Sequence, residues 1–160
     1  MEKKLFDNDK SAEKAIQLFK KAFKIVKGKM SPTLAEAVIG KLVMDVNGNP
    51  LVAGDCTISR DLTRVRVRLN VNLAAGYVEN EPENKAWKFI MTTVRHECLH
   101  AFQWLWVAKK AGHRGIDKMR RYIEEVDYKQ SVLEKGAKMY EDEDNASLQD
   151  FNTDLAIFVK

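Results

Sequence analysis

Cysteine and long apolar runs are scarce in this chain of 160 residues. Its two cysteines, Cys56 and Cys98, lie in unrelated contexts, which excludes a disulfide framework and a four-cysteine zinc site. This usage indicates a reducing compartment. No run of about 18 apolar residues occurs, so we expect no membrane-spanning helix. Because the N-terminal residues also lack the apolar core of a signal peptide, we expect a cytoplasmic protein.

What remains is the composition of an ordinary globular protein. Hydrophobic residues make up 45% and charged residues 31% of the chain, and 160 residues suffice for one domain with a real core. We therefore expect a single domain spanning residues 1–160. The net charge of +4 permits contact with nucleic acid but does not require it.

The strongest functional signal is a His-Glu-x-x-His motif at residues 96–100. On a helix, His96 and His100 lie on one face and direct two imidazoles at one point. Zn²⁺ accepts neutral imidazole nitrogen and keeps one position open in catalytic sites. Glu97, about 100° round the helix from His96, would reach a metal-bound water as general base. The motif thus predicts one bound zinc ion.

The motif lies within a long predicted helix over residues 82–111. Pro82 suits a first helical turn, and Gly112 suits the position just after a helix. Apolar residues cover most of the side away from the histidines: Trp87, Ile90, Val94, Cys98, Ala101, Phe102 and Leu105. We therefore expect this helix to be central and mostly buried.

Elsewhere the pattern predicts a mixture of helices and strands, which is an α+β class. Apolar spacing predicts an amphipathic helix over residues 11–27 and a second long helix from about Ile116 to Tyr140. Residues 73–81 are expected to form a loop, and 154–160 a strand or a docked tail. Three segments are predicted strands: 41–46, 51–59 and 64–70.

Catalytic zinc usually has three protein ligands, so a third must come from elsewhere. His113 is the only other histidine. In one continuous helix it would lie about 20 Å from His100. Gly112 and Gly115 flank it, however, and would let the chain fold back towards the motif.

A carboxylate on the following helix is the alternative third ligand. Asp127 borders the predicted apolar face of that helix, whereas Glu124 and Glu125 are expected to face water. Asp127 would otherwise hold a histidine ring from behind. The spacing alone therefore leaves three possibilities for the third ligand: His113, a carboxylate, or neither of these.

Three further segments accompany the motif. Ala53-Gly54 precedes a predicted strand, the strand at 66–70 ends in Leu-Asn, and Gly112-His113 is followed by Met-Arg-Arg-Tyr-Ile at 119–123. Together with the helix segment at 96–102, they resemble the SprT-like (Spartan-type) zinc metalloproteases. The C-terminal zinc ribbon common in that family is absent from this sequence.

The resemblance implies a zincin-like fold, with a small, mostly antiparallel sheet packed on the long active-site helix and a second long helix. It implies zinc bound by His96, His100 and His113. It also implies a metalloendopeptidase in which Glu97 activates a zinc-bound water, with DNA-associated proteins as expected substrates. Tyr122 and Tyr128 are candidate oxyanion donors.

Several basic residues are candidates for contact with DNA. The arginines on one strand face could instead protect the edge of the sheet or form salt bridges. The candidates are Arg64, Arg66, Arg68, Lys110 and Arg114. A competing hypothesis is a non-catalytic structural, assembly or nucleic-acid-binding protein with the same fold. Glu97 favours catalysis, because a structural metal site does not need it. The sequence does not specify an oligomeric state.

Overall fold

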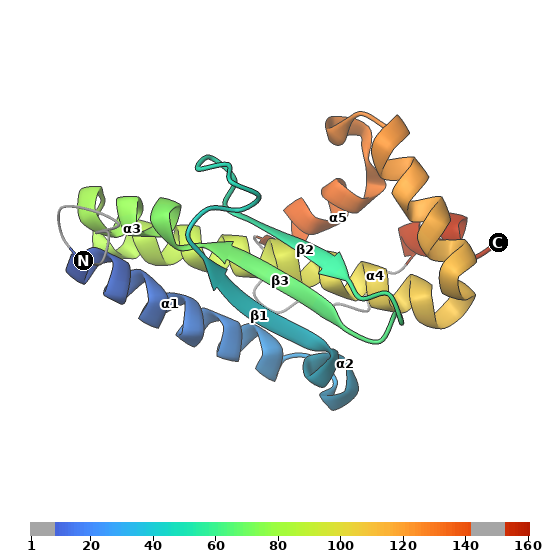
Figure 1. Cartoon of the computed structure of the whole chain (residues 1–160), viewed down its shortest axis with the longest axis horizontal. Coiled ribbons are helices and arrows are strands. Elements are labelled where there is room, and N and C mark those ends of the chain that lie inside the picture. Colours follow the sequence, from blue (N-terminus) through green and yellow to red (C-terminus); the bar gives the residue numbers. More distant parts are fainter. Residues whose placement is uncertain (1–8, 142–152) are drawn as a thin grey trace.

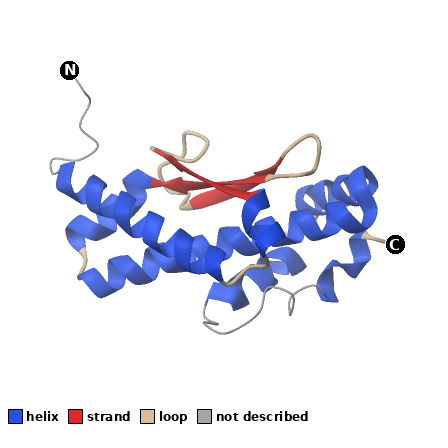
Figure 2. Ribbon diagram, turned by 90° about the horizontal axis from the view of Figure 1, so that it is seen from below, coloured by secondary structure: helices blue, strands red, loops and turns tan. Residues whose placement is uncertain are grey.

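The computed structural model describes residues 9–141 and 153–160, and it confirms the α+β class. The helices gather on one face of a small sheet, and helix α4 (Glu83–Glu125) runs along the molecule beneath it (Figures 1 and 2). Helix α1 (Asp9–Gly28) lies on the same side and matches the predicted amphipathic helix. A short helix α2 (Pro32–Ala37), capped by Ser31, leads into the sheet.

The sheet contains three strands in the order β1-β3-β2, namely β1 (Val38–Val43), β2 (Gly54–Ile58) and β3 (Val65–Asn70). β2 pairs antiparallel with β3, but β1 pairs parallel with it. The expectation of a mostly antiparallel sheet was therefore wrong, because residues 44–53 carry the chain from β1 to the far side of β3.

The central strand β3 shows the predicted alternation. Val65, Val67 and Leu69 are buried against the helices, whereas Arg64 and Arg66 are exposed on the open face of the sheet. Burying every second residue on one face is what fixes strand register in a one-sided sheet. The buried residues form one cluster with the apolar faces of α1 and α4.

The segment predicted as a loop after β3 is a helix, α3 (Val71–Asn80), so that prediction was wrong. Asn70 caps it: its side chain accepts a hydrogen bond from Leu73 N at 3.0 Å and donates one to Val52 O at 2.9 Å. Ala74 and Ala75 are fully buried on the helix, which packs against α1. The burial of this face outweighs the helix-weakening effect of Gly76.

The predicted second long helix is divided in the structure. Gly112 (φ 58°, ψ −147°) interrupts α4 where a break was expected, and the helix then continues to Glu125. A turn at Tyr128–Gln130 follows, and the chain reverses into α5 (Val132–Glu141). Figure 1 shows α5 returning beside α4. The sequence did not reveal this break because Leu133, Ala137 and Tyr140, which lie on the buried face of α5, continue the apolar spacing of the preceding helix.

The C-terminal residues form a docked tail, one of the two predicted alternatives. Thr153–Phe158 is a short 3-10 helix whose Leu155 and Phe158 are buried, and Phe158 packs edge-on against Tyr122. Within the described ranges, no helix is long and apolar enough to cross a membrane.

Gly54 lies where β2 approaches both the neighbouring strand β3 and helix α4 closely. A Cβ atom there would lie 2.9 Å from Arg68 O and 3.0 Å from Glu97 Cγ. We predict that Gly54→Ala lowers the free energy of unfolding by about 1–3 kcal/mol, because β2 must shift away from α4. Chemical denaturation measures this change.

The matched control is Gly76→Ala, where a Cβ meets nothing within 4 Å in the middle of α3. It should raise the free energy of unfolding by about 0.5–1 kcal/mol, since alanine favours the helix. An unchanged stability in Gly54→Ala would contradict the close approach.

Candidate metal centre

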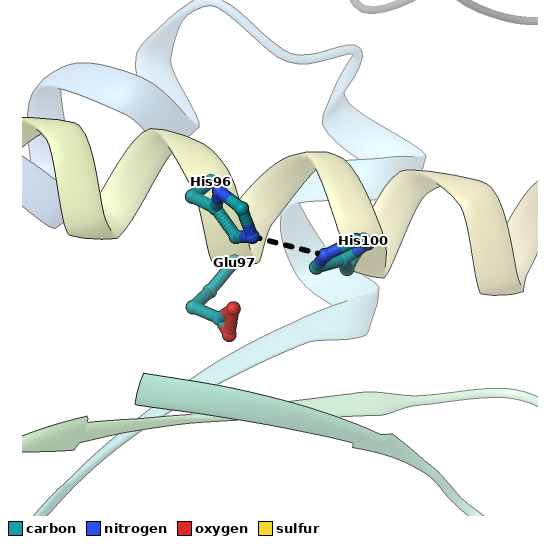
Figure 3. A group of neighbouring side chains, drawn as sticks. All are labelled: His96, Glu97 and His100. Atoms are coloured by element: carbon teal, nitrogen blue, oxygen red, sulfur yellow. Dashed lines mark hydrogen bonds between the residues drawn. The ribbon is translucent and has the colours of Figure 1, made fainter. Parts of the chain in front are cut away.

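His96, Glu97 and His100 form a group on α4 that could hold a metal ion, as the motif predicts (Figure 3). The two imidazoles lie one helical turn apart and point the same way, with their Nε2 atoms 3.1 Å from each other. One ligand atom from each of the three residues lies within 4.8 Å of the others. The rings are only partly buried, so a cavity reaches them.

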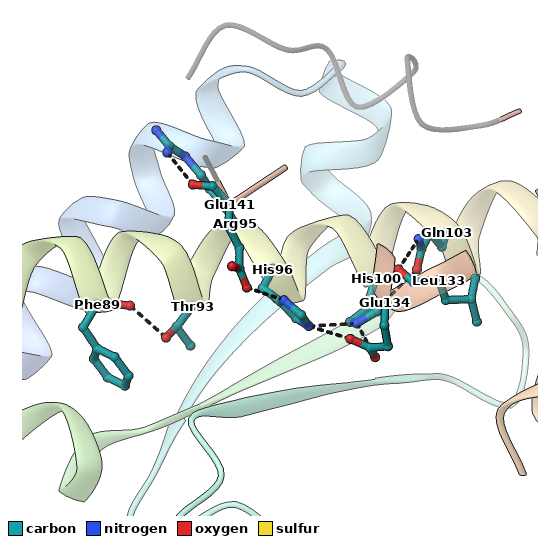
Figure 4. A network of polar contacts seen from close by, with 9 residues as sticks. All are labelled: Phe89, Thr93, Arg95, His96, His100, Gln103, Leu133, Glu134 and Glu141. Atoms are coloured by element: carbon teal, nitrogen blue, oxygen red, sulfur yellow. Dashed lines mark hydrogen bonds and ion pairs between the residues drawn. The ribbon is translucent and has the colours of Figure 1, made fainter. Parts of the chain in front are cut away.

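A carboxylate that the sequence analysis missed joins this pair. Glu134 on α5 places Oε1 2.9 Å from His100 Nε2 and Oε2 3.0 Å from His96 Nε2 (Figure 4). Glu134 Oε2 is buried, and its contact with His96 Nε2 is an ion pair. Three groups of the kind that bind metals thus converge on one point from two helices.

The structure does not bring the predicted third ligands to this point. His113 is exposed on the part of α4 beyond Gly112, and Asp127, Glu124 and Glu125 are exposed as well. None of the four lines the cavity around the motif. The helix resumes directly after Gly112 and carries His113 away, whereas the later reversal into α5 brings Glu134 back.

A sequence signal for Glu134 existed. Glu134 and Glu141 are seven residues apart and border the apolar stripe of α5, so they share one side of that helix. Side chains that flank an apolar stripe lie at the edge of the buried face, so both carboxylates were candidates for partly buried positions. One continuous helix was expected from about Ile116 to Tyr140, and these two carboxylates were not considered as ligands.

The outer nitrogen of each histidine is also bonded. His96 Nδ1 lies 2.7 Å from Glu141 Oε1, and His100 Nδ1 lies 2.7 Å from Gln103 Oε1. Arg95 Nη1 in turn donates to Glu141 O at 3.0 Å. Such partners behind a ring orient the opposite nitrogen towards a metal. Glu141, the first residue of an acidic run at 141–144, is therefore part of the site, while residues 142–144 lie outside the described residues.

Glu97 has one buried carboxylate oxygen, Oε2, without a hydrogen-bond partner. Its side chain lies between α4 and β2, the residue is 5% exposed, and Oε2 makes no hydrogen bond. Burial raises the pKa of this carboxyl group, and the two histidines oppose that shift. A buried carboxyl group with a raised pKa and a free oxygen facing a cavity is suited to proton transfer.

The charges around the histidines favour a cation. Burial lowers the pKa of His96, but Glu134, Glu97 and Glu141 outweigh it and raise that pKa to about 9. Burial likewise raises the pKa of Glu134, yet hydrogen bonds from both histidines hold it well below its usual range. Three carboxylates around two imidazoles would be balanced by a divalent cation.

The site opens into a cavity of about 770 Å³. Residues 52–56, which lead into and form part of β2, line one side of it. An apolar wall stands beyond His100 and consists of Trp104, Met119, Ile123 and Val126. The space is large enough for several residues of a bound peptide or a comparable organic molecule.

The two tyrosines named from the sequence have different surroundings. Tyr122 uses its hydroxyl oxygen to accept a hydrogen bond from Val132 N at 2.8 Å, at the start of α5. Tyr128 lines the cavity, and burial together with a hydrogen bond to Glu134 raises its pKa to about 12. Of the two tyrosines, only Tyr128 is therefore placed to donate a proton or a hydrogen bond within the cavity.

The basic residues named as DNA contacts lie away from the cavity lining. Arg68 binds Asp55, with Nε 2.7 Å from Oδ1, so salt bridging describes this residue. Arg64 and Arg66 are exposed on the sheet, Lys110 lies over the Trp106 ring, and Arg114 is exposed. DNA contact stays a prediction.

Comparison of the chain with protein families, curated proteins and solved structures finds no match. The resemblance to the SprT-like proteases therefore stays a prediction from the motifs. The geometry of the side chains carries the functional argument.

The ligand set can be tested by metal content. We predict about one metal ion per chain in the wild type, retention in His113→Ala, and loss in Glu134→Ala, because Glu134 alone joins the two imidazoles from α5. Elemental analysis after dialysis measures the ratio. Retention in Glu134→Ala together with loss in His113→Ala would overturn the arrangement.

Proposed function

We propose that this protein is a zinc-dependent endopeptidase with a zincin-like fold, whose ion is held by His96, His100 and Glu134. The observation that carries the proposal is the convergence of two imidazole Nε2 atoms, 3.1 Å apart, with one carboxylate whose two oxygens lie 2.9 and 3.0 Å from them. Tetrahedral zinc, with bonds of about 2.0–2.1 Å, places its ligands about 3.3 Å apart. Two histidines with a glutamate are also a known donor set of catalytic zinc.

A catalytic site fits better than a structural one. Structural zinc is usually enclosed by four protein ligands, whereas a catalytic ion keeps one position open. His96, His100 and Glu134 would be three protein ligands at the wall of a cavity, so the fourth position of the ion would face that cavity.

The side chains around that position suit hydrolysis of an amide bond. A bound zinc ion would supply Lewis acidity, which polarises a carbonyl group and acidifies water. Glu97 would take the proton from the attacking water and pass it to the leaving amine. The Tyr128 hydroxyl would donate a hydrogen bond to the developing oxyanion.

The neighbouring strand suits an extended peptide. In the described part of the chain β2 pairs on one side only, with β3, and its residues 54–56 line the cavity. An edge strand can bind an extended chain through backbone hydrogen bonds. This favours a peptide over a compact small molecule as the substrate.

The first test concerns the proton carrier. Glu97→Gln should retain zinc, because Glu97 is not in the proposed ligand set, and should lower kcat on an unstructured protein substrate about 10²–10⁴-fold. Wild type, variant and zinc-stripped wild type are compared by cleavage assay and elemental analysis. Equal cleavage by wild type and variant, or none by zinc-loaded wild type, would refute the proposal and favour a non-catalytic role.

A second test separates the two tyrosines. Tyr128→Phe should lower kcat about 10²-fold with little change in KM, as expected when one oxyanion donor is removed. Tyr122→Phe should instead lower thermal stability, because Val132 N loses its partner. The reverse assignment of the two effects would show that Tyr128 is not the donor.

A further inference from the structure

Gln103 is a buried polar residue that the proposed reaction does not use. It lies on α4, three residues beyond His100, and is 2% exposed. Its Oε1 is 2.7 Å from His100 Nδ1, and its Nε2 donates to Leu133 O at 3.1 Å (Figure 4). One side chain therefore joins a histidine of the site to the backbone of α5.

The backbone carbonyl decides how the amide is oriented. Leu133 O can only accept a hydrogen bond, so the NH₂ group of Gln103 must face it. The amide oxygen then faces His100 Nδ1, which must carry a proton to donate. In neutral imidazole the other nitrogen, Nε2, then has its lone pair available for a metal ion, beside Glu134 Oε1 at 2.9 Å.

The same amide also fixes the helix that carries the third ligand. Leu133 directly precedes Glu134, so a bond to its carbonyl restrains the backbone next to that carboxylate. Packing is close at this point, since a Cβ on Gly136 would lie 3.4 Å from Gln103 Nε2. Gln103 thus helps to set the position of Glu134 relative to His100, because it bonds both His100 and the backbone carbonyl that precedes Glu134.

We propose that Gln103 is a positioning residue: it sets the tautomer of His100 and holds the Glu134 end of α5 against it. The inference rests on the proposed ligand set, but it concerns metal affinity rather than cleavage. Partners behind a metal-bound histidine typically change metal affinity by about 10–100-fold when they are lost.

Three variants separate this role from simple filling of space. Gln103→Leu removes both hydrogen bonds, Gln103→Glu keeps an acceptor for His100, and Gln17→Leu makes the same chemical change at an exposed position of α1. Zinc affinity is measured by competition with a chromophoric chelator. We expect Gln103→Leu to bind about 10–100-fold more weakly, Gln103→Glu to recover part of the loss, and Gln17→Leu to match the wild type.

A second measurement needs no variant. In zinc-loaded wild-type protein with ¹⁵N-labelled histidine, NMR should show a protonated, slowly exchanging Nδ1 on His100, because that N–H is buried against Gln103. Coordination through Nδ1, or a proton on Nε2, would overturn the inference. Unchanged zinc affinity in Gln103→Leu would do the same, as would equal losses in Gln103→Leu and Gln103→Glu.

The failure of this inference is distinguishable from failure of the proposed function. Zinc binding that responds to Gln103 in a protein that cleaves no peptide would support the positioning role and refute the peptidase. A wild-type protein that cleaves peptide, combined with an unchanged zinc affinity in Gln103→Leu, would refute the positioning role alone. A wild-type protein that binds no zinc would refute both.

Discussion

The site depends on one contact between two helices: the Glu134 carboxylate of α5 meeting the imidazoles of His96 and His100 on α4. Each group alone would be costly to bury, because a charge or an unpaired polar atom loses its hydration. Together they balance, and a cation at their centre would complete the balance. The reversal of the chain after Glu125 is therefore as important to the site as the motif itself.

The fold contributes this contact and also limits the space around it. Leu133, Ala137 and Tyr140 bury the apolar side of α5, which leaves Glu134 and Glu141 directed at the two rings. On the other side, β2 approaches so closely that only glycine fits at position 54, beside Glu97. The Glu97 carboxyl group and the side chains of the candidate metal site thus lie between packed surfaces that restrict their movement.

Much of the architecture followed from local patterns. The apolar spacing of α1 and of the first part of α4, and the alternation in β3, identified the helices and the central strand, because burial of one face fixes both periods. Helix α3 was missed because residues 73–81 were expected to form a loop, whereas Ala74 and Ala75 are buried and the helix packs on α1. The direction of β1 was missed because strand order depends on where a connecting loop crosses the sheet.

The sequence by itself determined the relation of His96, Glu97 and His100, because three residues within one helical turn have their geometry fixed by the helix. Only the tertiary structure decided that Glu134 rather than His113 or Asp127 meets them, and that Gln103 and Glu141 stand behind the rings. A short turn between helices can send the chain in several directions. The direction taken is set by the burial of α5 against α4, which no local spacing encodes.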